Sequence, residues 1–370
     1  MRIAIDTFPF LLRSAGVKTA LYEWVKALRA AGSPHRISCF PYLDLPETLD
    51  HERSPLPRLN TWLRLAYVHA FNKAPELARN ALAPRADLFH ISIHLHQPPT
   101  KVPVSTTIHD MTVWLVPETH TPGNVRANKA FAEHVYSQAR GLIAVSQATK
   151  DDACRLLRID ERKVEVVPNG IAPAYFDVPE AEAARVRAAY RLPANFALYL
   201  GTIEPRKNVP RMLDAWMALR ETEREDWQLI LAGPVGWEQQ STVERIRQGG
   251  DSLRYLGYVP EADLPGLFRA AKFFVYPSLY EGFGLPPAQA LAAGVPVLTS
   301  GVSSLPEVCG PGAVYVDPLS EAELRRAFGR LIADTTLRSD LAGAGRAHVG
   351  KFTWENAAAK SLRFFERITG

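Results

Sequence analysis

The chain has 370 residues, more than a single hydrophobic core usually organises, so we expect two domains of about 150 to 200 residues each. Its composition, with 47% hydrophobic and 22% charged residues, is typical of a globular protein and excludes low-complexity and collagen-like chains. A formal net charge of +4 suits a phosphate-bearing ligand, and it is too small for the basic surface of a nucleic-acid-binding protein.

The first residues, MRIAIDTFPFLL, predict a buried strand rather than an export signal, because Asp6 and Pro9 interrupt the short apolar run. No charge-free apolar segment reaches the roughly 18 residues that a membrane span needs. The cysteines Cys39, Cys154 and Cys309 lie far apart without metal-ligand spacing, which is typical of reduced thiols. We therefore expect a cytoplasmic protein whose contact with a membrane, where there is any, is peripheral and at the inner face.

Short β-branched or aromatic runs alternate with helical patterns in the first half of the chain, which indicates a parallel sheet covered on both faces. The helix predicted from Val17 to Ala31 carries Trp24, Val25 and Leu28 on one apolar stripe. The strands are predicted at Arg2–Thr7, Ile37–Leu43, Leu88–Leu95, Val104–His109, Leu142–Ser146 and Val164–Pro168.

The segment Leu59–Leu82 is both apolar and locally basic. Between Arg53 and Lys101 there are seven Lys or Arg residues and two acids, and Trp62 stands close to Arg64. The pattern favours an amphipathic helix packed on its own sheet. The alternative is a helix that lies on an anionic membrane or beside a lipid-linked acceptor.

The alternation restarts in the second half and predicts a second doubly wound domain. Pro and Gly residues between 168 and 173 place the linker at about 170–195. The predicted domains are therefore 1–175 and 176–350, followed by a C-terminal helix in 351–370 that Thr353 can cap. The six strand candidates of the second domain are FALYLGT, WQLILAGP, SLRYLGYV, KFFVYPS, VPVLTS and GAVYVDP.

The segment Ser278–Ser300 joins a strand to a helix through a Gly/Pro turn. Gly282 and Gly284 allow close approach of the backbone to a ligand, and the helix that follows directs its positive end toward an anion. Glu281 precedes this turn, where it can accept hydrogen bonds from sugar hydroxyls. By itself the turn is equally compatible with Glu281 as a solvated carboxylate.

The segment GTIEPRKN, residues 201–208, ends the first strand of the second domain with Arg206 and Lys207 just before a helix. Two cations at a helix N-terminus form a strong site for a diphosphate, since Arg binds it bidentately and Lys acts as a point charge. Alone, such a pair is more often a solvated turn.

With these motifs the chain resembles glycosyltransferase family 4, a retaining family of GT-B architecture, over its whole length. The motifs occur in the family's order: V-P-N-G at 167–170, G-T-x-E-P-R-K-N at 201–208, E-G-F-G-L-P-P at 281–287, S-S-L-P-E-V at 303–308 and V-D-P at 316–318. The resemblance implies two Rossmann-like domains that face a central cleft, with the C-terminal helix crossing back to the N-terminal, acceptor-side domain. It places nucleotide-sugar binding in the C-terminal domain.

The resemblance implies that Arg206 and Lys207 hold the donor diphosphate, that Glu281 contacts the transferred sugar and that Gln289 contacts the ribose. The family usually has Glu at the position of Gln289, and the amide keeps an acceptor while losing the charge. Tyr258 and Val259 resemble the segment whose backbone contacts the base, with a buried strand end as the equal alternative. The remaining donor-site residues of the glycine-rich turn are Gly282, Phe283, Gly284 and Leu285.

In the first domain, the resemblance assigns His109 a contact with the donor sugar or the acceptor, and Asp110 a weaker supporting role. The family's glycine-rich loop corresponds to residues 11–20, where Gly16 is the one glycine kept. Arg13 and Lys18 flank Gly16 as candidate anion contacts.

His90, His94 and His96 alternate along one predicted strand, which raises the hypothesis of a metal site. We reject it, because no Asp, Glu or Cys accompanies them, and we favour acceptor binding instead. The chain also contains no Asp-x-Asp sequence. We therefore expect neither a metal nor another cofactor, and the cations must neutralise the leaving group.

The predicted reaction is transfer of a hexose from a nucleoside-diphosphate sugar to a hydroxyl of a glycan, lipid-linked or small-molecule acceptor, with retention implied by the resemblance. Mannose from GDP-mannose is favoured, and glucose from a UDP donor is the alternative. Glu281 is given an orienting and electrostatic role, and His109, Arg206 and Lys207 complete the predicted catalytic set. The rival hypotheses are a nucleotide-sugar epimerase of GT-B architecture and a degenerate nucleotide-sugar-binding protein.

Overall fold

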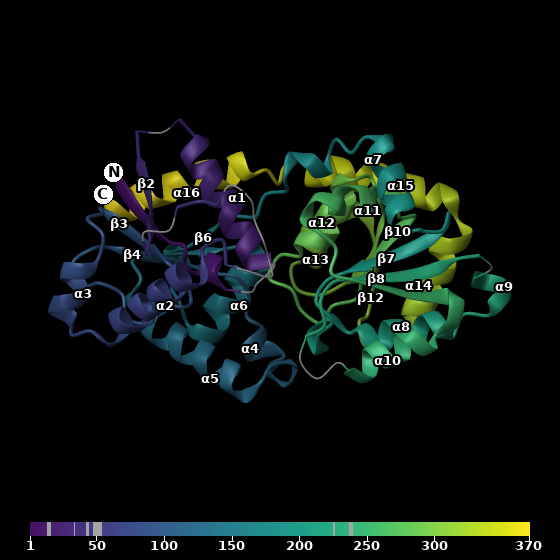
Figure 1. Cartoon of the computed structure of the whole chain (residues 1–370), viewed down its shortest axis with the longest axis horizontal. Coiled ribbons are helices and arrows are strands. Elements are labelled where there is room, and N and C mark those ends of the chain that lie inside the picture. The colour runs from purple at the N-terminus through teal and green to yellow at the C-terminus, as the bar shows by residue number, and fades with distance from the viewer. Residues whose placement is uncertain (13–15, 33, 42–43, 47–53, 225, 237–239) are drawn as a thin grey trace. The chain divides into compact units, whose positions relative to one another are not determined.

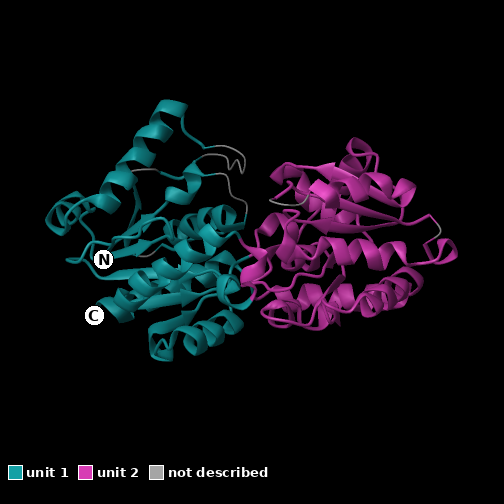
Figure 2. Cartoon of the chain, turned by 90° about the horizontal axis from the view of Figure 1, so that it is seen from below, with its two compact units in different colours: residues 1–115, 121–170, 352–370 teal, residues 116–120, 171–351 magenta. Residues whose placement is uncertain are grey.

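The computed structural model describes residues 1–12, 16–32, 34–41, 44–46, 54–224, 226–236 and 240–370. The chain forms two compact units, each built on a six-stranded parallel sheet (Figures 1 and 2). Unit 1 comprises residues 1–115, 121–170 and 352–370, and unit 2 comprises residues 116–120 and 171–351. The two sheets confirm the predicted doubly wound α/β fold class.

The sheet of unit 1 has the strand order β2-β1-β3-β4-β5-β6. Its strands are β1 (Arg2–Asp6), β2 (Arg36–Phe40), β3 (Leu88–Ile91), β4 (Val104–Ile108), β5 (Gly141–Ala144) and β6 (Val164–Val166). Its helices are α1 (Gly16–Ala30), α2 (Arg58–Lys73), α3 (Glu76–Leu82), α4 (Thr112–Leu115), α5 (Pro122–Phe131), α6 (Gln147–Leu157) and α16 (Trp354–Thr369). Because β1 lies between β2 and β3, the strand order reverses beside β1, where α/β sheets commonly bind ligands.

Successive side chains of β3 point to opposite faces of the sheet, where they pack in two different layers. Phe89 packs against Phe40 and shares a hydrophobic core with Phe71 of α2. His90, the next residue, points to the other face, where its ring lies 4.9 Å from the ring of Trp24 and 5.6 Å from that of Phe365, between centroids. Helices α1 and α16 therefore cover one face, and α2 covers the other.

The C-terminal helix α16 belongs to unit 1, as predicted. The Thr353 side chain accepts a hydrogen bond from Asn356 N at 3.1 Å and caps the helix. On the buried side, Trp24 Nε1 of α1 donates to Ser361 Oγ at 2.9 Å. None of the described helices combines the length and the apolar character that a bilayer crossing requires.

The sheet of unit 2 has the order β12-β11-β10-β7-β8-β9, so its strand order reverses between β7 and β10. Its strands are β7 (Phe196–Leu200), β8 (Gln228–Ala232), β9 (Leu253–Gly257), β10 (Phe273–Tyr276), β11 (Val297–Ser300) and β12 (Ala313–Val316). Its helices are α7 (Glu180–Ala189), α8 (Val209–Met217), α9 (Glu221–Arg224), α10 (Gln240–Gln248), α11 (Leu264–Ala270), α12 (Leu285–Ala292), α13 (Leu305–Cys309), α14 (Glu321–Ala333) and α15 (Thr335–Val349). Helix α7 lies within the segment that the sequence assigned to a linker.

Two adjacent aromatic residues of β10 define the layers of unit 2. The ring of Phe273 lies 6.2 Å from that of Phe328 on α14, and the ring of Phe274 lies 5.2 Å from that of Phe268 on α11, between centroids. Helices α11 and α14 therefore cover opposite faces of the sheet (Figure 1). The loops at the strand ends are not covered by these helices.

Gly170 ends the V-P-N-G segment where the chain passes the start of α16. A Cβ atom at this position would lie 2.3 Å from Trp354 N. Because backbone atoms cannot rotate away, we expect Gly170→Ala to lower the Tm of unit 1 by about 5 °C in differential scanning calorimetry. Gly329→Ala on α14, where nothing lies within 4 Å of the added atom, is the control and should leave the Tm unchanged or raise it. An unchanged Tm for Gly170→Ala would show that α16 yields to the extra atom.

Candidate functional site

The loops that follow β7 and β10 are bonded to each other at the carboxyl edge of the unit 2 sheet, where its strand order reverses. Leu279 N donates to Arg206 O at 2.9 Å. The Asn208 side-chain amide donates to Pro277 O at 3.1 Å and to Pro318 O at 2.7 Å, so it joins the ends of three strands. Asn208 has φ 58°, a left-handed conformation that Asn tolerates better than most residues. The geometry of this turn fixes Arg206 and Lys207 beside the other loop.

Glu281 is the centre of a buried ion cluster. Its Oε1 accepts from Lys207 Nζ at 2.6 Å and lies 2.8 Å from Arg206 Nη1. Glu204 is a second carboxylate, whose Oε1 accepts from Arg206 Nη2 at 2.7 Å. The exposed fractions of Glu204, Lys207 and Glu281 are 8%, 7% and 7%. Two carboxylates and two cations therefore neutralise one another away from solvent, which is what buried charges require.

Burial and charge act in opposite directions on these groups. Burial by itself would raise the pKa of Glu281, but Arg206 and Lys207 outweigh it and lower that pKa to about 2. Burial lowers the pKa of Lys207, and the neighbouring Arg206 lowers it further, while Glu281 and Glu204 oppose both effects. Glu281 is thus held ionised at neutral pH.

Lys207 also contacts an aromatic side chain, that of Tyr276. Its Nζ donates to the Tyr276 hydroxyl and lies 4.7 Å from the centre of the Tyr276 ring. Tyr276 stacks on Tyr199, with ring centroids 6.2 Å apart, and burial raises its pKa well above the ordinary value. The phenol remains neutral, so it orients Lys207 without adding charge.

Two serines of the S-S-L-P-E-V segment shape the loop that carries Glu281. Glu281 N donates to Ser303 Oγ at 3.0 Å, and Ser304 Oγ lies 2.9 Å from both Glu281 O and Phe283 O. Gly284 follows with φ 96°, and a Cβ there would lie 3.0 Å from Leu305 Cδ2. The left-handed backbone therefore favours glycine, and an added Cβ would also press on the Leu305 side chain of α13.

Helix α12 begins directly after this loop, but it offers fewer donors than the sequence analysis assumed. Pro286 and Pro287 stand in its first turn and have no N–H groups. Its dipole remains, yet only part of the expected N–H cluster can bind an anion. Gln289 lies further along α12 and is 8% exposed. No described residue forms a hydrogen bond with its side-chain amide.

Tyr258 and Val259 follow β9, which β7 and β8 separate from β10. Tyr258 is 42% exposed, whereas Val259 is 5% exposed and belongs to the core. The structure therefore puts these two residues at the same sheet edge as Glu281 but at the end of a different strand. Their contact with a base stays a prediction.

In unit 1, His109 lines a pocket at the carboxyl edge of the sheet beneath α1 and α16. Asp6 lies in the same pocket, where it accepts hydrogen bonds from Phe8 N at 2.9 Å and from Ser92 N at 3.1 Å. Burial raises the pKa of Asp6, although its hydrogen bonds oppose that shift. The pocket is lined by Asp6, Pro9, Val17, Ala20, Leu21, Trp24, His90, Ile91, Ser92, Thr107, His109, Ile143, Val145, Val167, Pro168, Asn169, Trp354 and Ala357.

The two histidines of this pocket are both held neutral. His90 Nδ1 lies 2.9 Å from Ser105 Oγ and Nε2 lies 3.0 Å from Thr107 Oγ1, and burial lowers its pKa to about 3. Burial also lowers the pKa of His109, against the opposite effect of Asp110. Asp110 accepts from Thr112 N at 3.0 Å and Thr112 Oγ1 at 2.6 Å, so its hydrogen bonds start α4 rather than orient His109.

Gly16 is the first residue of α1 and is exposed. Arg13 lies outside the described residues. Lys18 is buried, and its Nζ donates to Leu12 O at 3.0 Å, so the candidate anion contact instead holds the backbone before α1. Among the described residues of the predicted glycine-rich loop, Gly16 and Val17 are exposed.

The three alternating histidines do not share one strand, because β3 ends at Ile91. His94 packs on Phe8 with ring centroids 5.0 Å apart, and His96 packs on Phe131 at 5.9 Å. Among the residues that the structure describes, no group of three or more His, Cys, Asp or Glu side chains could hold a metal ion. The prediction of one histidine face is therefore wrong, since His94 and His96 lie in the turn after β3.

Comparison with known proteins identifies the family. Residues 14–175 match the family model described as Glycosyltransferase Family 4, and residues 182–348 match the model described as Glycosyl transferases group 1. The O-antigen chain mannosyltransferase B of Escherichia coli is 30% identical over 381 residues, which cover 100% of both chains. The chain belongs to glycosyltransferase family 4. The resemblance inferred from five short motifs is thereby confirmed.

Two further proteins are similar to this glycosyltransferase. The serotype-specific mannosyltransferase WbdA of Escherichia coli is 30% identical over 240 residues, which cover 63% of this chain and 29% of WbdA. The structure of sucrose-phosphate synthase from Thermosynechococcus elongatus superimposes with a TM-score of 0.76 at 22% identity, covering 100% of this chain and 99% of that one. This likeness confirms the GT-B fold.

In each unit, the structure also adds residues to the candidate site that the sequence analysis did not single out. Glu204 lies within the G-T-x-E-P-R-K-N motif, two residues before its partner Arg206, and the spacing could have indicated it. Tyr276 ends a predicted strand, and no local pattern distinguishes it from its aromatic neighbours. Asp6 ends the first strand of unit 1 and could have been found as a buried acid at a sheet edge.

The pKa of Glu281 predicts a pH dependence of stability. Its pKa falls from the ordinary value of 4.5 to about 2 in the folded protein, so Glu281 stabilises the fold fully above pH 4.5 and loses this contribution as the pH falls toward 2. The contribution is on the order of 3 kcal/mol. We expect the Tm of the wild type to exceed that of Glu281→Gln at pH 7, and the gap to narrow steadily between pH 4.5 and 3.

The control is Glu355→Gln, which removes an exposed carboxylate from α16. Its Tm should follow the wild type at every pH. A Tm gap for Glu281→Gln that stays constant from pH 7 to 3 would contradict the buried ion cluster.

Proposed function

We propose that this chain transfers mannose from a nucleoside-diphosphate mannose, with GDP-mannose as the favoured donor, to a hydroxyl of a growing surface polysaccharide of the O-antigen type. The observation that carries the proposal is the buried cluster of Arg206, Lys207 and Glu281 in a family 4 chain. The sugar is supported by relatives that are named mannosyltransferases. The acceptor class is supported by the relative named for the O-antigen chain, which aligns over its full length.

The cluster suits a sugar diphosphate in both of its parts. Arg206 and Lys207 present N–H donors at the carboxyl edge of the sheet, which a diphosphate can bridge. Glu281 is ionised and its second oxygen can accept hydrogen bonds from sugar hydroxyls. When a diphosphate engages the cations, it competes with Glu281 and Glu204 for them, so donor binding replaces part of the ion pairing within the cluster.

The proposed chemistry is an exchange at the anomeric carbon. The bond from that carbon to the β-phosphate oxygen breaks with its electron pair, and the acceptor oxygen forms the new bond while its proton leaves to a phosphate oxygen. Negative charge grows on the β-phosphate, where Arg206 and Lys207 stabilise it more than in the ground state. We propose attack on the same face as departure, which retains the anomeric configuration, with Glu281 orienting the sugar rather than forming a bond to it.

His109 is proposed to contact a sugar hydroxyl through its neutral ring. Its lowered pKa keeps it uncharged at neutral pH, so it can donate and accept without drawing the diphosphate toward itself. Gln289 is proposed to bind the ribose through its amide. No cofactor besides the nucleotide sugar is proposed, since the two cations supply the charge that the leaving group needs.

Substitution of the cluster tests these roles. We expect Glu281→Ala, and the double change Arg206→Ala with Lys207→Ala, to lower kcat/KM for sugar transfer by roughly 100-fold or more. The cation variant should also lose donor binding in calorimetry, because the diphosphate contacts are removed. The Glu281 variant should lose more in kcat than in KM, because its contacts concern the orientation of the sugar.

The matched control is Arg325→Ala with Arg326→Ala, which removes two exposed cations from α14 of the same unit. Its kcat/KM should equal that of the wild type. If the cluster variants kept transfer within a few-fold of the wild type while folding normally, the site would lie elsewhere.

A donor panel tests the reaction itself. The purified chain should bind GDP-mannose more tightly than UDP-glucose in calorimetry, hydrolyse it slowly, and transfer its sugar to an oligosaccharide acceptor with an α-linked product in NMR spectra. A chelator should leave the rate unchanged.

Each rival function gives a different result in the same panel. An epimerase would convert the free donor sugar without an acceptor. A degenerate binding protein would bind a nucleotide sugar and show neither hydrolysis nor transfer. Preference for UDP-glucose would contradict the choice of donor while leaving the transferase function intact.

A further inference from the structure

Helix α2 has an apolar surface that the rest of the described chain leaves uncovered. The exposed fractions of Leu59, Trp62 and Leu63 are 68%, 64% and 52%. These residues are spaced at i, i+3 and i+4, so they lie on one side of the helix. Ala66 and Ala70 continue the same exposed stripe. Three large apolar side chains on adjacent turns form a continuous patch, unlike the isolated exposed leucines common on protein surfaces.

The opposite side of α2 accounts for the packing of the helix on the sheet. Val68 and Phe71 are 2% and 0% exposed and belong to the hydrophobic core of unit 1. The helix is therefore apolar on both sides, and the side with Trp62 is not needed to hold it in place. The sequence analysis favoured a helix packed on its own sheet, and that packing uses only half of the apolar residues.

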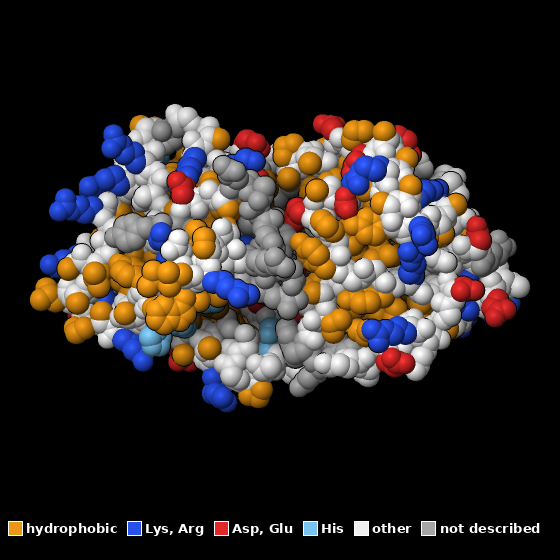
Figure 3. All heavy atoms as spheres, in the orientation of Figure 1, with side chains coloured by type: hydrophobic (Ala, Val, Ile, Leu, Met, Phe, Trp, Pro, Cys, Tyr) orange, Lys and Arg blue, Asp and Glu red, His pale blue; other side chains and the backbone are white. Residues whose placement is uncertain are grey.

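Helix α3 extends the patch. Leu77 and Leu82 are 77% and 42% exposed, and Tyr67 of α2 donates through its hydroxyl to Leu82 O at 3.1 Å, which joins the two helices. Figure 3 shows hydrophobic side chains gathered over this part of unit 1, with Lys and Arg side chains around them. We call Leu59, Trp62, Leu63, Leu77 and Leu82 the α2–α3 face.

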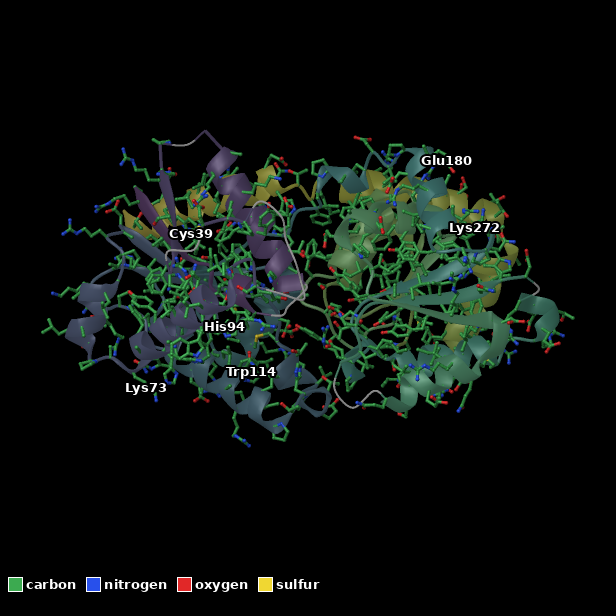
Figure 4. All side chains as sticks on the ribbon, viewed as in Figure 1. Cys39, Lys73, His94, Trp114, Glu180 and Lys272 are labelled. Carbon is green, nitrogen blue, oxygen red and sulfur yellow. The ribbon has the colours of Figure 1, made fainter. Side chains whose placement is uncertain are left out.

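The charges that the structure describes around the α2–α3 face are mostly positive. Helix α2 contains no Asp or Glu, and its exposed polar side chains include Arg58, His69 and Lys73. Lys73 extends from the surface end of α2 in Figure 4. Arg85, just beyond α3, is exposed as well.

Two acids also lie among the described residues of this region, and each has a polar partner. Asp87 pairs with Arg2 at 2.8 Å, and Glu76 accepts from Thr100 Oγ1 at 2.6 Å. An apolar stripe with a tryptophan, bordered by more cations than acids, has the chemistry of a surface that enters the headgroup region of an anionic bilayer.

We propose that the α2–α3 face binds peripherally to an anionic lipid surface. Leu59, Trp62 and Leu63 enter the boundary between headgroups and acyl chains, and Arg58 and Lys73 contact lipid phosphates. A second protein would need acids opposite these cations, whereas a bilayer containing anionic lipid supplies them everywhere. The proposal concerns a surface of unit 1 outside the sugar-transfer site, so it holds whichever sugar is transferred.

Vesicle flotation of the full chain tests the proposal. The wild type should float with vesicles of phosphatidylcholine containing about 30% phosphatidylglycerol and stay unbound with phosphatidylcholine alone, and salt at about 0.5 M should weaken binding several-fold. The triple change Leu59→Ser, Trp62→Ser, Leu63→Ser should weaken binding at least tenfold. The double change Arg58→Ser, Lys73→Ser should weaken it by roughly 30-fold, since each cation near an anionic surface contributes about fivefold.

Matched controls come from unit 2. Leu319→Ser removes an apolar side chain that is 64% exposed, and Lys272→Ser with Arg326→Ser removes two exposed cations, of which Lys272 is labelled in Figure 4. Both controls should bind vesicles like the wild type. All variants should keep the wild-type Tm and donor hydrolysis, because the substituted side chains lie on the surface.

A second measurement locates the contact. Brominated lipids should quench part of the tryptophan fluorescence of the wild type, and Trp62→Phe should remove that quenching while vesicle binding persists. Equal binding of the triple variant and the wild type would overturn the proposal, as would equal binding to neutral and anionic vesicles. A wild-type dimer in sedimentation velocity that the triple variant converts to a monomer would assign the face to a second copy of the chain instead.

Discussion

One carboxylate, Glu281, holds two cations together inside unit 2, and much of that unit's local structure serves this arrangement. Arg206 and Lys207 are neighbours in the chain and would repel each other when buried. Glu281 lies between their charged ends, and Glu204 balances the remaining charge. Removing either carboxylate would leave an uncompensated cation away from water, which is strongly destabilising. The cluster therefore constrains both loops that contribute to it.

The parallel sheet makes this encounter possible. Lys207 and Glu281 are 74 residues apart in the chain, yet β7 and β10 are neighbours because the strand order reverses between them. Asn208 then ties the two loops through carbonyl groups, and Ser303 and Ser304 from the loop after β11 hold the Glu281 backbone. A rigid edge is useful for catalysis because the charges are positioned before the substrate arrives.

Unit 1 has a different organisation. Its pocket is lined by neutral or neutralised groups: His90 and His109 have lowered pKa values, and Asp6 is satisfied by backbone and hydroxyl donors. Such a pocket suits the hydroxyl groups of a sugar better than a phosphate. On the far side of the sheet, α2 divides its apolar residues between the core and solvent, and this gives unit 1 a second surface with chemistry of its own.

The sequence by itself predicted the two sheets and the family. It also singled out Arg206, Lys207 and Glu281, which form one ion cluster in the structure. Strand periodicity and short motifs are local properties, so they can be recognised without coordinates. Only the tertiary structure decided which groups form hydrogen bonds and ion pairs with one another. The contact of Tyr276 with Lys207 and the hydrogen bonds from Ser92 to Asp6 join segments whose separation in the chain carries no signal. The same holds for α2, since an apolar residue pattern cannot tell which of two apolar faces the sheet will cover.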